Sequence, residues 1–162
     1  MVSRQEVGKE SFRKGKDFET IMKESWKKVP GSWRLRIKDG GGGESPGDDI
    51  ILLDKIRLLV EYKTTDKPVF SISGALKNNQ IYGGLAFMGL HPNNVSLVVI
   101  NFERYKAVYA LTMRELTQYI HDTGRMSLSV LHAKERGREI KLTNEYYDLN
   151  TFLKDSGYEY NT

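Results

Sequence analysis

The segment at residues 48–63, DDIILLDKIRLLVEYK, constrains the fold more than any other part of the chain. Two apolar runs of strand length, IILL and IRLLVEY, are separated by Asp54 and Lys55, which predicts a β-hairpin with its turn near these two residues. Both runs are far too short to span a bilayer, so they are expected to lie in the core of a folded domain. The hairpin is therefore the starting point for the predicted sheet.

The remaining hydrophobic pattern predicts a mixed central β-sheet flanked by helices, an α/β fold. Helical spacing of apolar residues covers 11–28, 73–90 and 113–122, and the last of these begins with a capping box at Thr112 and Glu115. Further strands are expected at 33–39, 95–102 and 106–111. The predicted order to this point is α-β-β-β-α-β-β-α. Beyond it, a hairpin of 127–133 and 138–142 around KERGR and a short helix near 150–155 are expected.

Length and composition indicate one domain of ordinary globular type. The chain has 162 residues, of which 39% are hydrophobic and 28% charged. We expect a core at about 9–123 and a C-terminal extension at 124–162 within a single domain of residues 1–162. The N-terminus lacks an apolar stretch behind its positive charges, and cysteine is absent, which excludes disulfides and thiolate metal sites. A cytoplasmic protein is the expectation.

Positive charge is concentrated at the front of the chain. Residues 1–38 contain eleven Lys and Arg against five Asp and Glu, a balance of +6, which leaves −2 for the remainder of a chain whose formal net charge is +4. Lysine and arginine gain affinity for nucleic acid by displacing its counterions, so this distribution fits a phosphate-rich partner. A solvated basic helix face explains the same charges equally well.

The ends of the hairpin bring together the side chains that could carry out chemistry. Glu61 and Lys63 are two residues apart on one strand and so project from the same face, and Asp48 or Asp49 begins the strand that pairs with it. Carboxylates suit a hard cation such as Mg²⁺ or Mn²⁺, and a nearby amine can orient water and stabilise charge, which points to phosphodiester hydrolysis. The alternative is an edge hairpin with surface salt bridges, each contributing about 0–1 kcal/mol.

The order of motifs resembles a known nuclease superfamily. Pro46-Gly47-Asp48-Asp49 followed by Glu61-Tyr62-Lys63 resembles the PD-(D/E)XK signature, with its restriction-endonuclease-like core. Within that superfamily the chain looks most like the Holliday junction resolvases, of the RecU type and the archaeal Hjc type. The elements that carry this likeness, in chain order, are Gly15-Lys16-Asp17-Phe18-Glu19, Trp33-Arg34-Leu35-Arg36 with the glycine run after it, and Asn78-Asn79-Gln80.

The resemblance implies an Mg²⁺-dependent endonuclease, with Mn²⁺ as a substitute, that cuts four-way DNA junctions as a homodimer. By this likeness the metal ligands are Asp49, which we slightly favour over Asp48, together with Glu61 and Glu19. Lys63 is implied to activate the water, and Gln80 to lie beside the site. The expected DNA contacts are Arg34, Arg36, Lys14 and Lys16.

The chain departs from the RecU type in one respect. Only about ten residues, mostly at 40–47, fill the place of the long insertion that forms the junction-entering stalk of those enzymes. A flap, restriction-type or repair nuclease without junction selectivity, and a non-catalytic DNA-binding protein on the same fold, are therefore the alternatives. The small size and basic front end would suit a phage enzyme of recombination or repair.

Overall fold

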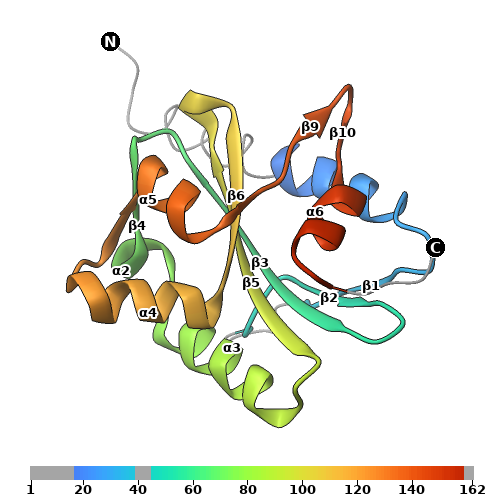
Figure 1. The fold of residues 1–162 in the computed structure, drawn as a ribbon, viewed down its shortest axis with the longest axis horizontal. Helices are drawn as coiled ribbons and strands as arrows, with labels where there is room; N and C mark the ends of the chain where they lie inside the picture. Colours follow the sequence, from blue (N-terminus) through green and yellow to red (C-terminus); the bar gives the residue numbers. More distant parts are fainter. Residues whose placement is uncertain (1–16, 39–44, 159–162) are drawn as a thin grey trace.

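The computed structural model describes residues 17–38 and 45–158, which form a six-stranded sheet covered by helices on both faces (Figure 1). The strand order is β1-β2-β3-β5-β6-β8, in which only β3 and β5 are parallel neighbours. The bounds are β1 Trp33–Arg36, β2 Asp49–Leu52, β3 Arg57–Thr65, β5 Asn94–Phe102, β6 Ala107–Thr112 and β8 Arg138–Glu139. The predicted mixed central sheet flanked by helices is confirmed.

The predicted hairpin is present as β2 and β3. Asp49 lies opposite Val60 and Leu52 opposite Arg57, and the Leu53 N–H donates to the Ile56 carbonyl at 2.9 Å across the turn. Residues 58–62 of β3 are all buried because the strand lies in the middle of the sheet, between β2 and β5. The hairpin therefore forms a fixed body whose open end carries the acidic residues.

Helices cover the two faces of the sheet in different places. The first helix, described over residues 17–26, lies on the face that carries the Tyr62 side chain, and Trp26 is buried against it. Helix α6 (Leu149–Asp155) follows a segment that contacts that helix, since the Tyr147 N–H donates to Ser25 Oγ at 2.9 Å. Helix α3 (Asn78–Leu90) packs on the opposite face, where Gly84 lies directly against the buried Ser96 of β5. The two faces at the open end of the hairpin are thus covered by different helices.

The helix predicted at 73–90 is interrupted. Leu76 and Lys77 adopt extended backbone conformations, so α2 (Ile72–Ala75) ends and α3 begins separately at Asn78. Residues 69–71 form a strand, β4 (Val69–Ser71), that pairs with β7 (Ser127–Ser129) in a small second sheet. The break places the start of α3, with Gln80, at the open end of the hairpin.

The hairpin predicted at 127–133 and 138–142 is wrong. Within 127–133 only residues 127–129 form a strand, because the Ser129 side chain caps a helix by accepting the His132 N–H, and α5 (Val130–Arg136) follows. The expected KERGR turn is the end of this helix, and the chain then continues into β8 beside β6. A two-stranded sheet of β9 (Leu142–Thr143) and β10 (Tyr146–Tyr147) precedes α6.

Two further helix predictions are confirmed. The capping box at Thr112 and Glu115 begins α4 (Met113–Thr123), and Gly124 ends it with a φ of 66°. The short helix expected near 150–155 is α6. Among the residues that the structure describes, no helix is both long and apolar enough to cross a membrane.

Candidate active site

Four side chains meet where the open end of the hairpin lies beside the start of α3. Asp48, Glu61, Lys63 and Gln80 are called the carboxylate cluster below. Lys63 Nζ lies 2.8 Å from Glu61 Oε1, and Gln80 Nε2 donates to the same oxygen at 2.8 Å. Asp49 is paired with Val60, so the alternation of strand side chains puts Asp48 on the opposite face, the face of Glu61.

Gln80 is held in a defined orientation by the start of α3. Its Oε1 accepts the backbone N–H of Lys77 at 3.0 Å, which leaves its Nε2 to donate to Glu61. The interruption between α2 and α3 is what brings this N-terminal turn to the sheet. The first turn of α3 is therefore hydrogen-bonded to Glu61 through Gln80.

Burial makes Glu61 difficult to ionise. Removal of the carboxyl from water, followed by the charge of Asp48, raises the pKa of Glu61 to about 7, against the opposing effects of Lys63 and Gln80. Both of its donors act on Oε1, whereas its Oε2 is buried and has no hydrogen-bond partner among the described residues. One oxygen of Glu61 is thus bound by the protein and the other is left for a further partner.

Asp48 is positioned by the backbone of the neighbouring strand. The N–H of Tyr62 donates to Asp48 Oδ2 at 2.8 Å, and the Asp48 N–H donates to the Val60 carbonyl at 2.8 Å. Burial raises the pKa of Asp48, although the Tyr62 N–H and Lys63 act in the opposite direction. The residue before it must be small, since a Cβ at Gly47 would lie 2.9 Å from Leu59 Cδ1.

Asp49 lies on the other face of the sheet, away from Glu61 and Lys63. Its side chain is 1% exposed, and Arg34 Nε donates to its Oδ2 at 2.8 Å. The sequence slightly favoured Asp49 over Asp48 as the metal ligand, and this placement favours Asp48 instead. Asp48 is the acid that faces Glu61, and Asp49 belongs to a buried ion pair behind the strand.

Glu19 approaches the site from the first helix. Burial raises the pKa of Glu19, and the charge of Asp48 is the next largest cause, so the two carboxylates lie within electrostatic reach of each other. Arg36 Nη2 lies 3.9 Å from Glu19 Oε2. Glu19 is therefore at the margin of the cluster, with a cation of its own beside it.

The basic residues predicted to contact DNA have different surroundings. The Arg36 side chain is 63% exposed and is accessible to a phosphate, but Arg34 is largely buried in its pair with Asp49. The basic face of β1 is thus divided: Arg34 points toward the buried Asp49 and Arg36 toward solvent, and Trp33 and Leu35 on the other face are 62% and 44% exposed. Lys14 and Lys16 lie outside the described residues.

The donor set fits a hard divalent cation in part. Asp48 and Glu61 provide oxygen ligands of the type that Mg²⁺ prefers, and Glu61 Oε2 is a buried acceptor without a partner. Within residues 17–38 and 45–158, no three Asp, Glu or His side chains are grouped closely enough to complete a metal site. Asp49 Oδ1 is also buried without a partner, but its neighbour is Arg34, which already supplies a positive charge.

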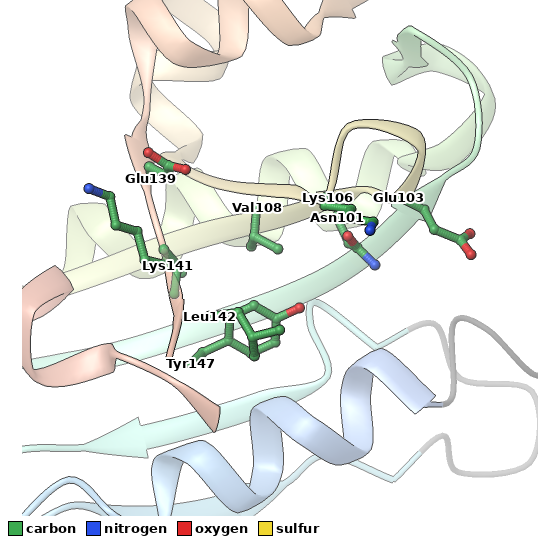
Figure 2. A pocket seen from close by; sticks show the side chains of 9 residues that line it. Asn101, Glu103, Lys106, Val108, Glu139, Lys141, Leu142 and Tyr147 are labelled. Atoms are coloured by element: carbon green, nitrogen blue, oxygen red, sulfur yellow. The ribbon is translucent and has the colours of Figure 1, made fainter. Parts of the chain in front are cut away.

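A separate pocket lies away from the cluster. Its volume is about 420 Å³, and it lies where residues of β5 and β6 face β8, β9 and β10 (Figure 2). Asn101 and Val108 in its lining pair with each other, and Asn101 also pairs with Thr64, which projects from the face opposite Lys63. The pocket therefore lies on the face of the sheet opposite the carboxylate cluster and shares no residue with it.

The sheet order, with the hairpin acids at one end of the strands and helices on both faces, defines a restriction-endonuclease-like α/β fold. A solved structure with a similar fold is Hjc of Archaeoglobus fulgidus, a Holliday junction resolvase from an archaeal hyperthermophile. The TM-score is 0.54 and the identity is 15%, over 76% of this chain and 93% of that one. No family model and no curated protein matches the chain. The likeness establishes the fold.

Two residues that matter for the geometry were not selected from the sequence. Trp26 is one of the apolar residues of the first helical segment, and Tyr62 stands between Glu61 and Lys63 on the strand. In the structure Trp26 Nε1 donates to the Tyr62 hydroxyl at 3.1 Å, behind the carboxylate cluster. An aromatic residue with a polar group on a buried face is the signal that could have identified them, since such groups need partners.

Proposed function

We propose that the chain is a metal-dependent endodeoxyribonuclease that hydrolyses DNA phosphodiesters at the carboxylate cluster. The observation that carries this proposal is the different environment of the two carboxylate oxygens of Glu61. Lys63 and Gln80 both donate to Oε1, whereas the buried Oε2 has no hydrogen-bond partner among the described residues and lies beside a second acid, Asp48. A salt-bridged edge hairpin would not need two acids in the interior, where each costs free energy. The fold of a resolvase around this cluster supports the same conclusion.

Mg²⁺, or Mn²⁺ in its place, would be held by Asp48 and Glu61, with Glu19 as the third candidate carboxylate. When bound there, the cation would neutralise these acids and polarise a phosphate oxygen. Lys63 is held 2.8 Å from Glu61 and retains partial exposure, so its ammonium can orient water toward a phosphodiester and stabilise developing negative charge. Gln80 keeps Glu61 in place by its hydrogen bond.

The role of Asp48 can be separated from that of Asp49 by comparing two isosteric variants. We expect Asp48→Asn to reduce the cleavage rate about 100-fold or more, because an oxygen of the cluster is replaced by an amide that binds cations poorly. Asp49→Asn keeps the shape of the buried partner of Arg34 and removes no oxygen from the cluster, so it should lower the rate far less than Asp48→Asn does. Inactivity of Asp49→Asn alone, with normal folding, would contradict the assignment.

The proposed substrate is branched DNA, and most specifically the four-way junction. Symmetric cutting of a two-fold-symmetric junction needs two active sites, so the proposed enzyme is a homodimer. Trp33 and Leu35, exposed on the edge strand β1, offer an apolar surface that a second copy can cover. Trp33→Glu should then lower the mass measured by light scattering, whereas Leu142→Glu on β9, also exposed, should not.

The decisive experiment compares the wild type with Lys63→Ala on four substrates of equal length: a four-way junction, a linear duplex, a single strand and a flap. Mg²⁺-dependent cleavage of the junction that Lys63→Ala abolishes is the expected result. Equal cleavage of all four substrates favours the nuclease without junction selectivity. DNA binding without cleavage in Mg²⁺ or Mn²⁺, unchanged by Lys63→Ala, favours the non-catalytic alternative.

A further inference from the structure

Tyr62 is connected to both faces of the sheet. The face that carries the carboxylate cluster is called the front face below, and the face covered by the first helix is called the back face. On the front face its backbone N–H donates to Asp48 Oδ2 at 2.8 Å. On the back face its hydroxyl accepts Trp26 Nε1 at 3.1 Å, and its ring packs edge-on against Phe18, with 6.2 Å between the ring centroids. The side chain is 5% exposed, so these contacts fix its position within the core.

The back face holds a second anchored group next to Tyr62. Asp49, which begins the neighbouring strand, is paired with Arg34 at 2.8 Å. Its charge, after burial, is the next largest cause that raises the pKa of the Tyr62 hydroxyl well above the usual range, so the carboxylate lies close to that hydroxyl. The first helix and strands β1, β2 and β3 therefore all meet at one buried polar group.

Asp49 and Tyr62, which lie together on the back face, alternate in sequence with residues of the carboxylate cluster. Asp49 follows Asp48, and Tyr62 stands between Glu61 and Lys63. Adjacent residues of a strand project from opposite faces, so a shift or rotation of the backbone at Tyr62 must move Glu61 and Lys63 and alter the N–H offered to Asp48. The positions of three cluster residues thus depend on how firmly one hydroxyl is held on the reverse face.

We propose that Tyr62, anchored by Trp26 beside the Arg34–Asp49 ion pair, is the positioning residue that sets Asp48 in place relative to Glu61 and Lys63. The inference rests on the proposed function for its catalytic readout, but its geometric content does not require that function. Tyr62 is assigned no contact with a reacting atom. It acts through the residues on either side of it and through the N–H that it gives to Asp48.

The test compares Tyr62→Phe, which keeps the ring and removes the hydroxyl, with Leu128→Ala, which creates a cavity in β7 of the separate two-stranded sheet. Both variants should lose stability, so stability alone does not discriminate between them. The measured quantities are kcat and KM for junction cleavage, the Mg²⁺ concentration that gives half-maximal rate, and hydrogen exchange at the Tyr62 amide. All are measured well below the melting temperature of each variant.

We expect Tyr62→Phe to lower kcat about tenfold or more, with little change in KM, because small displacements of catalytic groups are costly. The half-maximal Mg²⁺ concentration should rise, and the Tyr62 amide should exchange faster, while Leu128→Ala changes none of the three. Trp26→Phe should have the same effects in smaller measure. Its combination with Tyr62→Phe should add little, since both remove the same contact.

Unchanged kcat, Mg²⁺ dependence and amide exchange in Tyr62→Phe would overturn the inference and leave the hydroxyl with a structural role only. If the wild type cleaves no DNA, the proposed function fails, and the amide exchange decides the positioning role by itself. Faster exchange at Tyr62 in Tyr62→Phe than in Leu128→Ala then supports that role, and equal exchange overturns it. If Tyr62→Phe does not fold, the same readouts are taken on Trp26→Phe, with the same two outcomes.

Discussion

Replacement of Glu61 by glutamine should make the metal-free protein more stable while abolishing the proposed nuclease activity. The pKa of Glu61 is raised to about 7, from an ordinary value of 4.5, chiefly by burial and then by the charge of Asp48. Its ionisation therefore opposes folding. Glutamine has the same shape and can still accept the hydrogen bonds that Lys63 and Gln80 donate, but it carries no charge that must be buried.

The size and sign of the effect follow from proton linkage. Below about pH 4.5 the carboxyl is protonated in both the folded and the unfolded chain, and Glu61→Gln should change the free energy of unfolding little. Between about pH 4.5 and 7 the unfolded chain ionises first, so wild-type stability falls as pH rises through this window. Above pH 7 the accumulated penalty, and so the gain in Glu61→Gln, is about 3 kcal/mol.

Urea denaturation in EDTA from pH 4 to pH 9 measures this difference. Glu24→Gln is the control, because Glu24 is exposed and its hydrogen bond with Lys27 lowers its pKa, so its pH dependence should be small and of opposite sign. A Glu61→Gln variant that is less stable than the wild type at pH 8, or whose advantage does not grow with pH, would refute the reasoning.

The remaining predictions concern ion pairing, helix packing and metal binding. Arg34→Met should lower the free energy of unfolding by about 3–5 kcal/mol, because it leaves the Asp49 charge buried, whereas the exposed Arg36→Met should cost less than about 1 kcal/mol. Gly84→Ala should cost about 1–3 kcal/mol, since its Cβ would lie 2.5 Å from a buried serine hydroxyl on β5. Gly89→Ala, with open space around it, should stabilise the same helix by up to about 1 kcal/mol. Mg²⁺ at about 100 times its Kd should add about 2.7 kcal/mol over EDTA, and urea denaturation checks all of these values.

Most of the fold could be predicted from local patterns in the sequence. The hairpin, the strands β5 and β6, and the capped helix α4 each have a pattern that their own residues determine. Apart from the short helix α6, the region after residue 124 could not be predicted in this way. There the chain forms short elements whose conformation depends on distant partners, such as the pairing of β7 with β4.

The candidate site could be predicted as a set of residue types but not as an arrangement. The spacing of Glu61 and Lys63 placed both on one face, which is the arrangement that the structure has. Arg34 was expected to contact DNA, but it points inward because it pairs with Asp49, which is buried on the same face of the sheet. Which of two neighbouring acids faces the site depends on the sheet register, which local spacing does not determine.

The sequence of β2 determines its register only weakly. Residues 48–53 read D-D-I-I-L-L, so positions 48, 50 and 52 carry Asp, Ile and Leu, and positions 49, 51 and 53 carry the same three residue types. A slip by one residue ordinarily turns a strand inside out, but here both faces would still carry Asp, Ile and Leu in that order, and only one face would have them displaced along the strand. The pattern of apolar residues therefore cannot fix the register of this strand. The register is fixed by the Arg34–Asp49 pair and by the contact of Gly47 with Leu59. These two contacts therefore assign each acid to its face: in the observed register Asp48 faces Glu61, and in a register slipped by one residue Asp49 would face Glu61 instead.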